Sequence, residues 1–488
     1  MKDSLSLVPI VSSIRGIRIR CVGDIMLDRF VTGEVDRISP EAPVPVLRIV
    51  DEQEMVGGVG NVCRNLIGLG GTVDLVALTG DDKAGTLLQE MVGALEGATV
   101  NLIVESTRRT AIKTRFLAGN QQIMRADSEM VGQICSIIGG KLEAAATDEL
   151  ESYSALVLSD YGKGVFDSGR AQKLINAAQK ASVPVIVDPV GNDYTKYSSA
   201  DLVTPNRKEL AEATGLEVNN IKNVEAAATT LMRQHNFGSV LVTLSQDGML
   251  LVTDDESLHV STHAREVFDV SGAGDTVVAV LAGALAGGAV LADAVRLANL
   301  AAGVVVGKIG TGTVYTTEIV AALHHQEISR AEAKIISMKE VRDRVEVWHR
   351  QGLKIGFTNG CFDLLHPGHV SLLAQARDVV DKLIVGLNSD ESIARLKGKD
   401  RPVQNETSRA AVLASLASVD VVVLFSDDTP LDLIKYFQPD VLIKGSDYTK
   451  GEVVGAAEVE GWGGEIFLAT LVEGHSTTAT IRRLAERG

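Results

Sequence analysis

Short apolar segments rich in β-branched residues alternate along the chain with polar turns and longer amphipathic segments. The apolar segments tend to close on Gly, Asp, Asn or Ser, which favour turns, and helical patterns follow several of them. In the first part of the chain, strands are predicted at 17–22, 73–78, 155–158, 183–187, 202–203 and 239–243. Because alternating strands and helices are typical of a parallel sheet covered by helices, we expect an α/β fold.

Two segments carry strand patterns without intervening helices. Residues 31–50 are rich in Val and Pro, and we expect short strands there that form a small β lid or a dimer edge. Residues 99–125 carry a local excess of basic side chains, among them Arg108, Lys113 and Arg115. In an acidic protein this basic density would suit a phosphorylated substrate. A solvated strand face is an equally good interpretation for any one of these residues.

A glycine-rich stretch at 269–275 precedes a run of uncharged, mostly small residues at 277–292. A helix that begins at this stretch points free backbone N–H groups and the positive end of its dipole at an anion. Asp275 could take a hydroxyl proton while these N–H groups hold a phosphoryl group. The alternative is a glycine-rich turn before a buried helix. Since the run is shorter than the roughly 20 residues of a membrane span, we expect a core helix.

The pattern changes in the last third of the chain. A charged helical segment without Pro or Gly is expected at 326–351. Its length and charge indicate a linker that passes into the first helix of a second domain. A chain of 488 residues also exceeds what one hydrophobic core usually supports. We therefore predict two domains, 1–330 and 331–488.

The second domain begins with a predicted strand at 354–357 and a polar turn that contains two imidazoles. Pro367 favours the first position of a helix, so His366 and His369 lie at a helix N-terminus and can face one ligand. Metal ligands, a pair that grips phosphate and structural histidines are the three interpretations. A metal site usually needs a third ligand, and the neighbouring sequence offers no further cluster of His, Cys or acids.

Composition and charge exclude several classes of function. The net charge of -16 argues against broad binding to nucleic acid or an anionic membrane, because phosphate-backbone affinity comes mainly from Lys and Arg. The N-terminus lacks the cleavage pattern of a signal peptide. The four cysteines are scattered without a CxxC pair, so we expect neither a disulfide framework nor a zinc site. A reducing cytoplasm fits this composition.

The order of the strand-end motifs across residues 11–320 resembles the ribokinase-type carbohydrate kinases. The motifs that carry the resemblance are Asp28, Gly57-Gly58 with Asn61, Thr79-Gly80-Asp81-Asp82, Asn206 with Glu209, Thr243 with Gly248, and Asp269 to Asp275. Ser271 stands where many members have Thr, which keeps the hydroxyl. The resemblance implies a ribokinase-like domain that uses ATP to phosphorylate a sugar.

The same resemblance implies a role for each matched residue. Asp275 would be the general base, with Gly272, Ala273 and Gly274 as the anion hole. The sugar would be held by Asp28, Gly58 and Asn61. Asn206 and Glu209 would help to organise Mg²⁺, and Thr243, Gly248 and Asn299 would lie near the adenine nucleotide.

The His-x-Gly-His motif resembles that of the nucleotidyltransferases, a family that includes glycerol-phosphate cytidylyltransferase and pantetheine-phosphate adenylyltransferase. This resemblance covers nearly all of 350–485 and implies a Rossmann-like domain in which His366 and His369 stabilise the α-phosphate. The residues implied to bind the nucleotide are Thr358, Asn359, Phe362, Asp363, Lys399, Arg401, Lys444, Asp447, Ser476, Thr477 and Thr478. Whether Lys397 or Lys399 has the main role stays open. His475 replaces an Ile of the cytidylyltransferases, which leaves the choice of base open.

A sugar kinase followed by a nucleotidyltransferase resembles the bacterial bifunctional enzymes of ADP-heptose synthesis, which serve lipopolysaccharide core assembly. The resemblance implies sugar phosphates and ATP as partners, phosphorylation of D-glycero-β-D-manno-heptose 7-phosphate at C1, and adenylyl transfer to heptose 1-phosphate. It also implies a homodimer through the kinase lid. The alternatives are a sugar or polyol kinase fused to a cytidylyltransferase, and an inactive sugar or nucleotide sensor.

Overall fold

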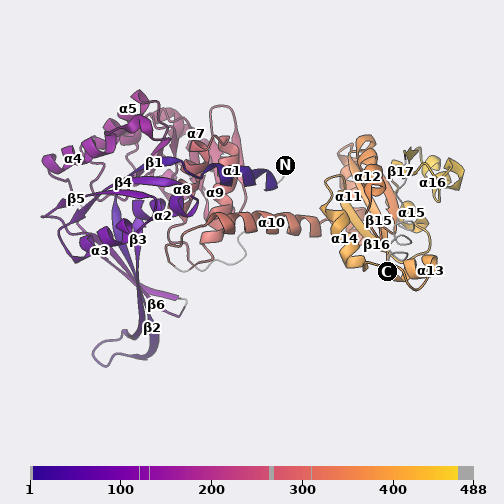
Figure 1. The fold of residues 1–488 in the computed structure, drawn as a ribbon, viewed down its shortest axis with the longest axis horizontal. Coiled ribbons are helices and arrows are strands. Elements are labelled where there is room, and N and C mark those ends of the chain that lie inside the picture. The colour runs from indigo at the N-terminus through magenta and orange to yellow at the C-terminus, as the bar shows by residue number, and fades with distance from the viewer. Residues whose placement is uncertain (1–3, 120, 131, 263–268, 309, 471–488) are drawn as a thin grey trace, which may run out of the picture. The chain divides into compact units, whose positions relative to one another are not determined.

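The computed structural model describes residues 4–119, 121–130, 132–262, 269–308 and 310–470 (Figure 1). The chain divides into two compact units, Met1–His324 and His325–Gly488. We describe each unit by itself.

A nine-stranded sheet forms the centre of the first unit, in the order β13-β12-β11-β10-β9-β8-β1-β4-β5. The strands from β11 to β5 pair in parallel, whereas β12 and β13 add an antiparallel edge. Their bounds are β1 Arg18–Gly23, β4 Thr72–Gly80, β5 Ala98–Glu105, β8 Ala155–Ser159, β9 Val185–Asp188, β10 Leu202–Val203, β11 Val240–Thr243, β12 Met249–Val252 and β13 Ser257–Val260. Helices that connect the strands confirm the predicted α/β fold class.

The helices of this unit cover both faces of the sheet. Their bounds are α1 Val8–Ser13, α2 Val59–Gly68, α3 Lys83–Gly93, α4 Ser136–Thr147, α5 Arg170–Lys180, α6 Arg207–Thr214, α7 Ile221–His235, α8 Ala273–Ala286, α9 Leu291–Val305 and α10 Thr316–Glu332, the last of which crosses the division between the units. Val157 and its neighbour Leu158 belong to different core clusters, as expected when successive side chains of a strand point to opposite faces. The sheet is therefore buried on both sides, which explains its continuous apolar strands.

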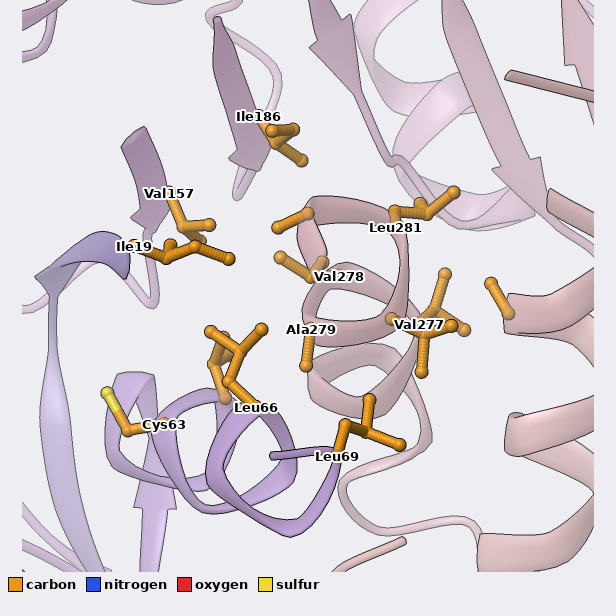
Figure 2. Packing of buried hydrophobic residues seen from close by; sticks show 14 of the residues in the cluster. Ile19, Cys63, Leu66, Leu69, Val157, Ile186, Val277, Val278, Ala279 and Leu281 are labelled. Carbon is orange, nitrogen blue, oxygen red and sulfur yellow. The ribbon is translucent and has the colours of Figure 1, made fainter. Parts of the chain in front are cut away.

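One core cluster fixes the helix that carries the glycine-rich stretch. Figure 2 shows Leu66 of α2, and Leu69 directly after that helix, near Val278 and Ala279 of α8. Ile19 of β1 belongs to the same core cluster. All of these side chains are at most 1% exposed. The N-terminus of α8 is thus held against α2 by close packing.

A second sheet of four strands, in the order β3-β2-β6-β7, extends from this body (Figure 1). Its bounds are β2 Ile25–Ile38, β3 Pro45–Gly58, β6 Ala111–Ala118 and β7 Gln121–Ser128. The expected lid is present, but the short strands predicted at 31–50 are parts of two strands of 14 residues each. Asp28, predicted to follow a strand end in a loop, lies within β2. Antiparallel pairing of β2 with β3, from Ile25 with Gly58 to Ile38 with Pro45, sustains these long strands past Gly33 and Pro45, where the local sequence favours a break.

The second unit contains a five-stranded sheet, all parallel, in the order β16-β15-β14-β17-β18. Its strands are β14 Ile355–Gly360, β15 Lys382–Asn388, β16 Val421–Phe425, β17 Val441–Gly445 and β18 Glu465–Ala469. Its helices are α11 Met338–Arg350, α12 Pro367–Val379, α13 Asp390–Lys397, α14 Glu406–Ser415, α15 Leu431–Phe437 and α16 Ala456–Gly461. The parallel sheet agrees with the Rossmann-like domain that the resemblance implied.

The segment predicted to be helical at 326–351 contains parts of two helices. The structure has α10 and α11, separated by a segment in which Ile335 forms a parallel bridge to Val422 of β16. Ser337 then caps α11, because its hydroxyl accepts the Glu340 N–H and the Glu340 carboxylate accepts the Ser337 N–H. This capping box starts a new helix in a segment that contains no Pro or Gly.

The apolar run at 277–292 also forms two helices instead of one. α8 ends at Ala286, and α9 begins at Leu291 after a turn in which Gly288 has φ +84°. Within the part of the chain that the structure describes, no helix is long and apolar enough to span a membrane.

Leu66→Ala tests the packing of α2 against α8. Leu66 is fully buried, so the variant should lower the free energy of unfolding of the first unit by about 2 to 5 kcal/mol. Urea denaturation followed by far-UV circular dichroism measures this change. Both tryptophans, Trp348 and Trp462, lie in the second unit, and their fluorescence transition serves as an internal reference.

Ile137→Ala is the matched control for this variant. The Ile137 side chain lies on α4 and is 73% exposed, so the change should stay within about 0.5 kcal/mol. Equal effects of the two substitutions would contradict the packing argument.

Candidate functional site

Asp275 lies in the first turn of α8 and is 2% exposed. Both of its carboxylate oxygens accept hydrogen bonds. Asn61 Nδ2 donates to Oδ2 at 2.9 Å, and the Tyr161 hydroxyl donates to Oδ1 at 2.7 Å. Burial raises the pKa of Asp275 to about 6, the Asp28 charge adds to the rise, and the two hydrogen bonds oppose it. The structure thus brings together two predicted residues, Asp275 and Asn61, and adds Tyr161.

Gly272 precedes α8 in the left-handed region, with φ +77°. A Cβ atom at this position would lie 2.6 Å from Asn61 Nδ2. Glycine is required here both by the backbone angle and by the amide that binds Asp275. Gly272, Ala273 and Gly274 accordingly place the helix N-terminus next to the carboxylate, as predicted.

The lid sheet supplies a second acidic residue and two cations. Asp28 on β2 pairs with Arg115 on β6 at 2.5 Å; the Asp28 side chain is buried and that of Arg115 is partly buried. The Lys113 ammonium lies 5.0 Å from the centre of the Tyr161 ring, and burial lowers the pKa of Lys113. Lys113 is also among the charges that act on Asp275. Arg115 and Lys113 therefore lie on the side of the lid that faces the Asp275 carboxylate.

Arg108, the third basic residue predicted to bind substrate, is bonded to other parts of the protein. Its guanidinium donates to the Glu105 carboxylate at 2.9 Å, to the Lys163 carbonyl at 2.7 Å and to the Gly132 carbonyl at 3.2 Å. These bonds join three segments of the chain. In this structure the Arg108 guanidinium is therefore bonded to protein oxygens, and its predicted role in substrate binding stays a prediction.

Gly58 ends β3 and precedes α2, with φ +61°. A Cβ atom added at Gly58 would collide with the Asp24 carbonyl oxygen, and one added at Gly57 would collide with the Asp28 carboxylate. These close approaches leave no room for a side chain at either position, which explains the glycine pair. Asn61 follows in the first turn of α2.

A cleft opens in front of Gly274. The residues that line it are Asp160, Tyr161, Asp188, Pro189, Val190, Thr204, Asn206, Glu209, Thr243, Gly274 and Val277. Four predicted residues, Asn206, Glu209, Thr243 and Gly274, therefore meet at one surface. Gly248 and Asn299 are not among the lining residues. Gly248 lies in the turn between β11 and β12, and the Asn299 amide donates to the Ser261 carbonyl at 3.0 Å.

Asn206 and Glu209 form a capping box at the start of α6. Asn206 Oδ1 accepts the Glu209 N–H at 3.0 Å, and the Glu209 carboxylate accepts the Asn206 N–H at 2.8 Å. Burial raises the pKa of Glu209. Asp188 lies in the same cleft, and burial, with the neighbouring Asp275 and Glu209 charges, raises its pKa well above the usual range. Carboxylates crowded together in this way favour a cation.

Asp24 and Tyr161 also belong to the site, although neither was among the predicted site residues. Asp24 follows β1 and is 2% exposed, and its Oδ2 accepts the N–H groups of Tyr161 at 2.8 Å and Lys163 at 3.0 Å. Burial and the Asp160 charge raise the pKa of Asp24 to about 6. The available signal was their position directly after β1 and β8, where ligands bind in open α/β sheets.

In the second unit, the two predicted histidines lie at the N-terminus of α12. Their rings stack with centroids 3.8 Å apart, and the Phe362 ring lies 5.0 Å from that of His369. Burial, followed by the His366 charge, lowers the pKa of His369 to about 4. His369 is therefore neutral at pH 7 and offers an N–H group without a charge.

An ion pair joins Asp363 to Arg401 at 2.5 Å. Asp363 also accepts the N–H groups of Val403 and Gln404, at 2.7 and 3.2 Å. Burial alone would raise the pKa of Asp363, but these hydrogen bonds and Arg401 lower it. Arg401 Nη2 is buried and has no hydrogen-bond partner among the described residues, so it remains a donor for a ligand.

Lys444 donates to the Asn359 side chain at 2.6 Å, and burial lowers the pKa of Lys444 to about 8 while the Asp447 charge opposes the change. Thr358 is buried at the same strand end. Lys397 and Lys399 are both exposed, and Lys397 is among the charges that lower the pKa of His369. Ser476, Thr477 and Thr478 lie outside the described residues.

These two sites agree with the families that the sequence matches. Residues 17–318 match the pfkB family of carbohydrate kinases, and residues 357–483 match the cytidylyltransferase-like family. Phosphofructokinase-2 from Escherichia coli in complex with fructose-6-phosphate superposes with a TM-score of 0.53 at 23% identity, covering 63% of this chain and 99% of that chain. Arabidopsis thaliana ribokinase complexed with ribose and ATP gives 0.50 at 21% identity, covering 63% and 99%. The chain is a bifunctional kinase and nucleotidyltransferase.

Relatives of full length define the family more narrowly. The bifunctional protein HldE of Rhodospirillum rubrum is 53% identical over 485 residues, which are 99% of this chain and 98% of that protein. HldE of Paramagnetospirillum magneticum is 54% identical, with 99% of each chain covered. This chain belongs to the HldE family of bifunctional proteins. The predicted family, fold class and enzyme class are confirmed.

Gly272→Ala tests the contact between the α8 N-terminus and Asn61. The new Cβ would displace the amide that binds Asp275, so phosphoryl transfer should fall by roughly 100-fold, as expected when a catalytic group moves by about 1 Å. The rate of ADP formation from ATP with the sugar substrate measures this loss.

Gly288→Ala is the matched control, since Gly288 has φ +84° at the other end of α8 and no atom within 4 Å of an added Cβ. It should cost about 1 to 2 kcal/mol of stability and retain phosphoryl transfer. An equal loss of activity in both variants would show that backbone strain alone is responsible.

Proposed function

We propose that residues 1–330 phosphorylate D-glycero-β-D-manno-heptose 7-phosphate at C1 with ATP, and that residues 331–488 transfer an adenylyl group from ATP to heptose 1-phosphate. The products of the second step are ADP-heptose and pyrophosphate. The observation that carries the proposal is the buried Asp275 carboxylate beside the N-terminus of α8, in a chain related over its full length to HldE proteins.

In the kinase step, Asp275 accepts the proton of the sugar hydroxyl while that oxygen attacks the γ-phosphorus of ATP. A hydroxyl is a poor nucleophile until its proton is removed, so a base with a pKa of about 6 is ionised and suited to this task near pH 7. The N–H groups at the start of α8, from Gly272 to Gly274, stabilise the charge on the transferring group. The bond to the β-phosphate oxygen breaks, and ADP leaves.

The cleft suits a Mg²⁺ ion that is bound through its water ligands. Asn206 and Glu209 present oxygen donors there, and Glu209 is partly buried, which raises its pKa. No group of three His, Cys, Asp or Glu side chains in the described ranges forms a metal cage. A bound Mg²⁺ would neutralise phosphate charge, with Asn206 and Glu209 holding its water ligands.

The adenylyl step needs no base, because heptose 1-phosphate is already ionised. His366 and the neutral His369 donate N–H groups to the α-phosphate of ATP, and Lys444 and the free Nη2 of Arg401 add positive charge. Lys397 is a better candidate than Lys399 for a phosphate contact, since its charge acts on His369. Pyrophosphate leaves as the sugar phosphate oxygen bonds to the α-phosphorus.

We also propose that the protein acts in the cytoplasm and forms a homodimer through the lid sheet. Large apolar side chains are exposed along the lid strands, and such patches favour protein contacts. They are Val35, Ile38, Ile49, Val50 and Met124.

Asp275→Asn should abolish sugar phosphorylation and spare pyrophosphate release, because the amide cannot accept the proton. His366→Ala should do the reverse. Both half-reactions are measured on each full-length variant, with ATP and with CTP as the nucleotide in the pyrophosphate assay. Loss of both activities in either variant would contradict independent sites, and turnover with CTP in place of ATP would favour the cytidylyltransferase alternative.

Lys113→Gln should raise KM for heptose 7-phosphate by roughly 10-fold or more, since a hydrogen bond to a charged phosphate contributes about 1.5 to 3 kcal/mol. Lys113 lies beside Tyr161 and acts on Asp275, whereas Arg108 is occupied by protein oxygens. Arg108→Gln should therefore lower the melting temperature with little change in KM. The opposite pattern would assign the substrate phosphate to Arg108.

A further inference from the structure

The Tyr161 side chain reaches Asp275 from a loop that is anchored independently of this contact. The loop follows β8, and the Asp24 carboxylate holds it through the N–H groups of Tyr161 and Lys163. Asp160 anchors the same loop through its carboxylate, which accepts bonds from Lys196 at 2.7 Å and from the Tyr197 hydroxyl at 2.6 Å. The position of the Tyr161 ring thus does not depend on its hydroxyl group.

We propose that Tyr161 is a positioning residue for the kinase reaction: its hydroxyl keeps the buried Asp275 carboxylate ionised and oriented toward the sugar hydroxyl. This inference rests on the proposed role of Asp275 as the general base. It assigns a function to a residue that touches the base without taking the proton itself.

The groups that face Asp275 come from several elements. Asn61 and Tyr161 donate to it from α2 and from the loop after β8, and Lys113 on β6 contributes a positive charge. Asp28 on β2 and Asp188 at the end of β9 oppose ionisation through their negative charges. The Asp275 charge also contributes to the raised pKa of the Cys63 thiol on α2. Burial and two acids therefore act against the ionised form, and two hydrogen bonds and one lysine support it.

Tyr161 can donate over the whole pH range of interest. Burial, followed by the Asp275 charge, raises the pKa of Tyr161 well above its ordinary value, so the phenol stays protonated. Each carboxylate oxygen has two acceptor positions, so Oδ1 can bind Tyr161 and still accept a substrate proton. Loss of the phenol would leave Asn61 as the single donor to Asp275 in the described part of the chain.

Tyr161→Phe removes the hydroxyl and keeps the ring. The acid limb of kcat/KM for heptose 7-phosphate should move upward by about one pH unit. The reason is that the lost hydrogen bond stabilises the ionised carboxylate by a free energy that corresponds to a pKa change of about one unit. The rate at pH 5.5 should then fall about 10-fold, and above pH 8.5 it should stay within about threefold of the parent enzyme. The measurement is a pH profile of the full-length protein from pH 5 to 9.5.

Tyr194→Phe is the matched control. Tyr194 is buried, and its hydroxyl has no hydrogen-bond partner among the described residues. Its removal should leave the profile unchanged. Pyrophosphate release by the second unit reports that this unit is intact, and far-UV circular dichroism of the same preparations reports that the first unit is folded.

An unmoved acid limb in Tyr161→Phe would overturn the inference, whether activity is retained or lost equally at every pH. Failure of the proposed function has a separate signature, namely phosphorylation that survives in Asp275→Asn. A shifted limb in Tyr161→Phe together with an inactive Asp275→Asn supports both.

Discussion

The proposed kinase chemistry depends on keeping one carboxylate buried and ionised at the same time. Burial excludes water from the reacting groups, but it also raises the pKa of Asp275 to about 6. Asn61 offsets this effect, and α2 holds Asn61 because Leu66 and Leu69 pack against α8. Asn65, one turn later, donates to the Asn61 carbonyl at 2.9 Å and accepts the Val314 N–H at 2.9 Å. The core and the site are therefore parts of one arrangement.

Both units place their chemistry at a helix N-terminus that follows a strand, but they use it differently. α8 begins after a glycine with positive φ and carries a carboxylate whose pKa is raised. α12 begins with Pro367, and its histidine pair includes His369, whose pKa is lowered. Asp363, three positions before His366 in the sequence, is bound by Arg401 and by backbone N–H groups, which lower its pKa and make it a weaker base. The difference matches the nucleophiles, since a sugar hydroxyl must lose a proton and a sugar phosphate need not.

Local patterns predicted the elements and the motifs, but they did not predict the partners. The helix starts at 273 and 367 follow from Gly and Pro chemistry, which acts within a few residues. Tyr161 and Asp275 are 114 positions apart, and Asn61 and Asp275 are 214 apart, so only the sheet order brings them together. The loop predicted around Asp28 is a strand for a related reason. Pairing with β3 and β6 extends β2 beyond the residues whose local sequence favours a strand. The break between α10 and α11 likewise depends on a bridge to β16, far along the chain.

Two groups with opposite protonation requirements set the pH range in which both proposed reactions proceed. In the proposed kinase step Asp275 must be ionised to accept a proton, so phosphorylation should be lost as the pH falls through about 6. In the proposed adenylyl step Lys444 must be charged to stabilise a phosphate, so its contribution should be lost as the pH rises through about 8. Burial is the main cause of both shifts, and it moves an acid upward and a base downward toward neutrality. The two units, with different folds and chemistry, therefore share a window around pH 7 because each buries the group that its reaction requires.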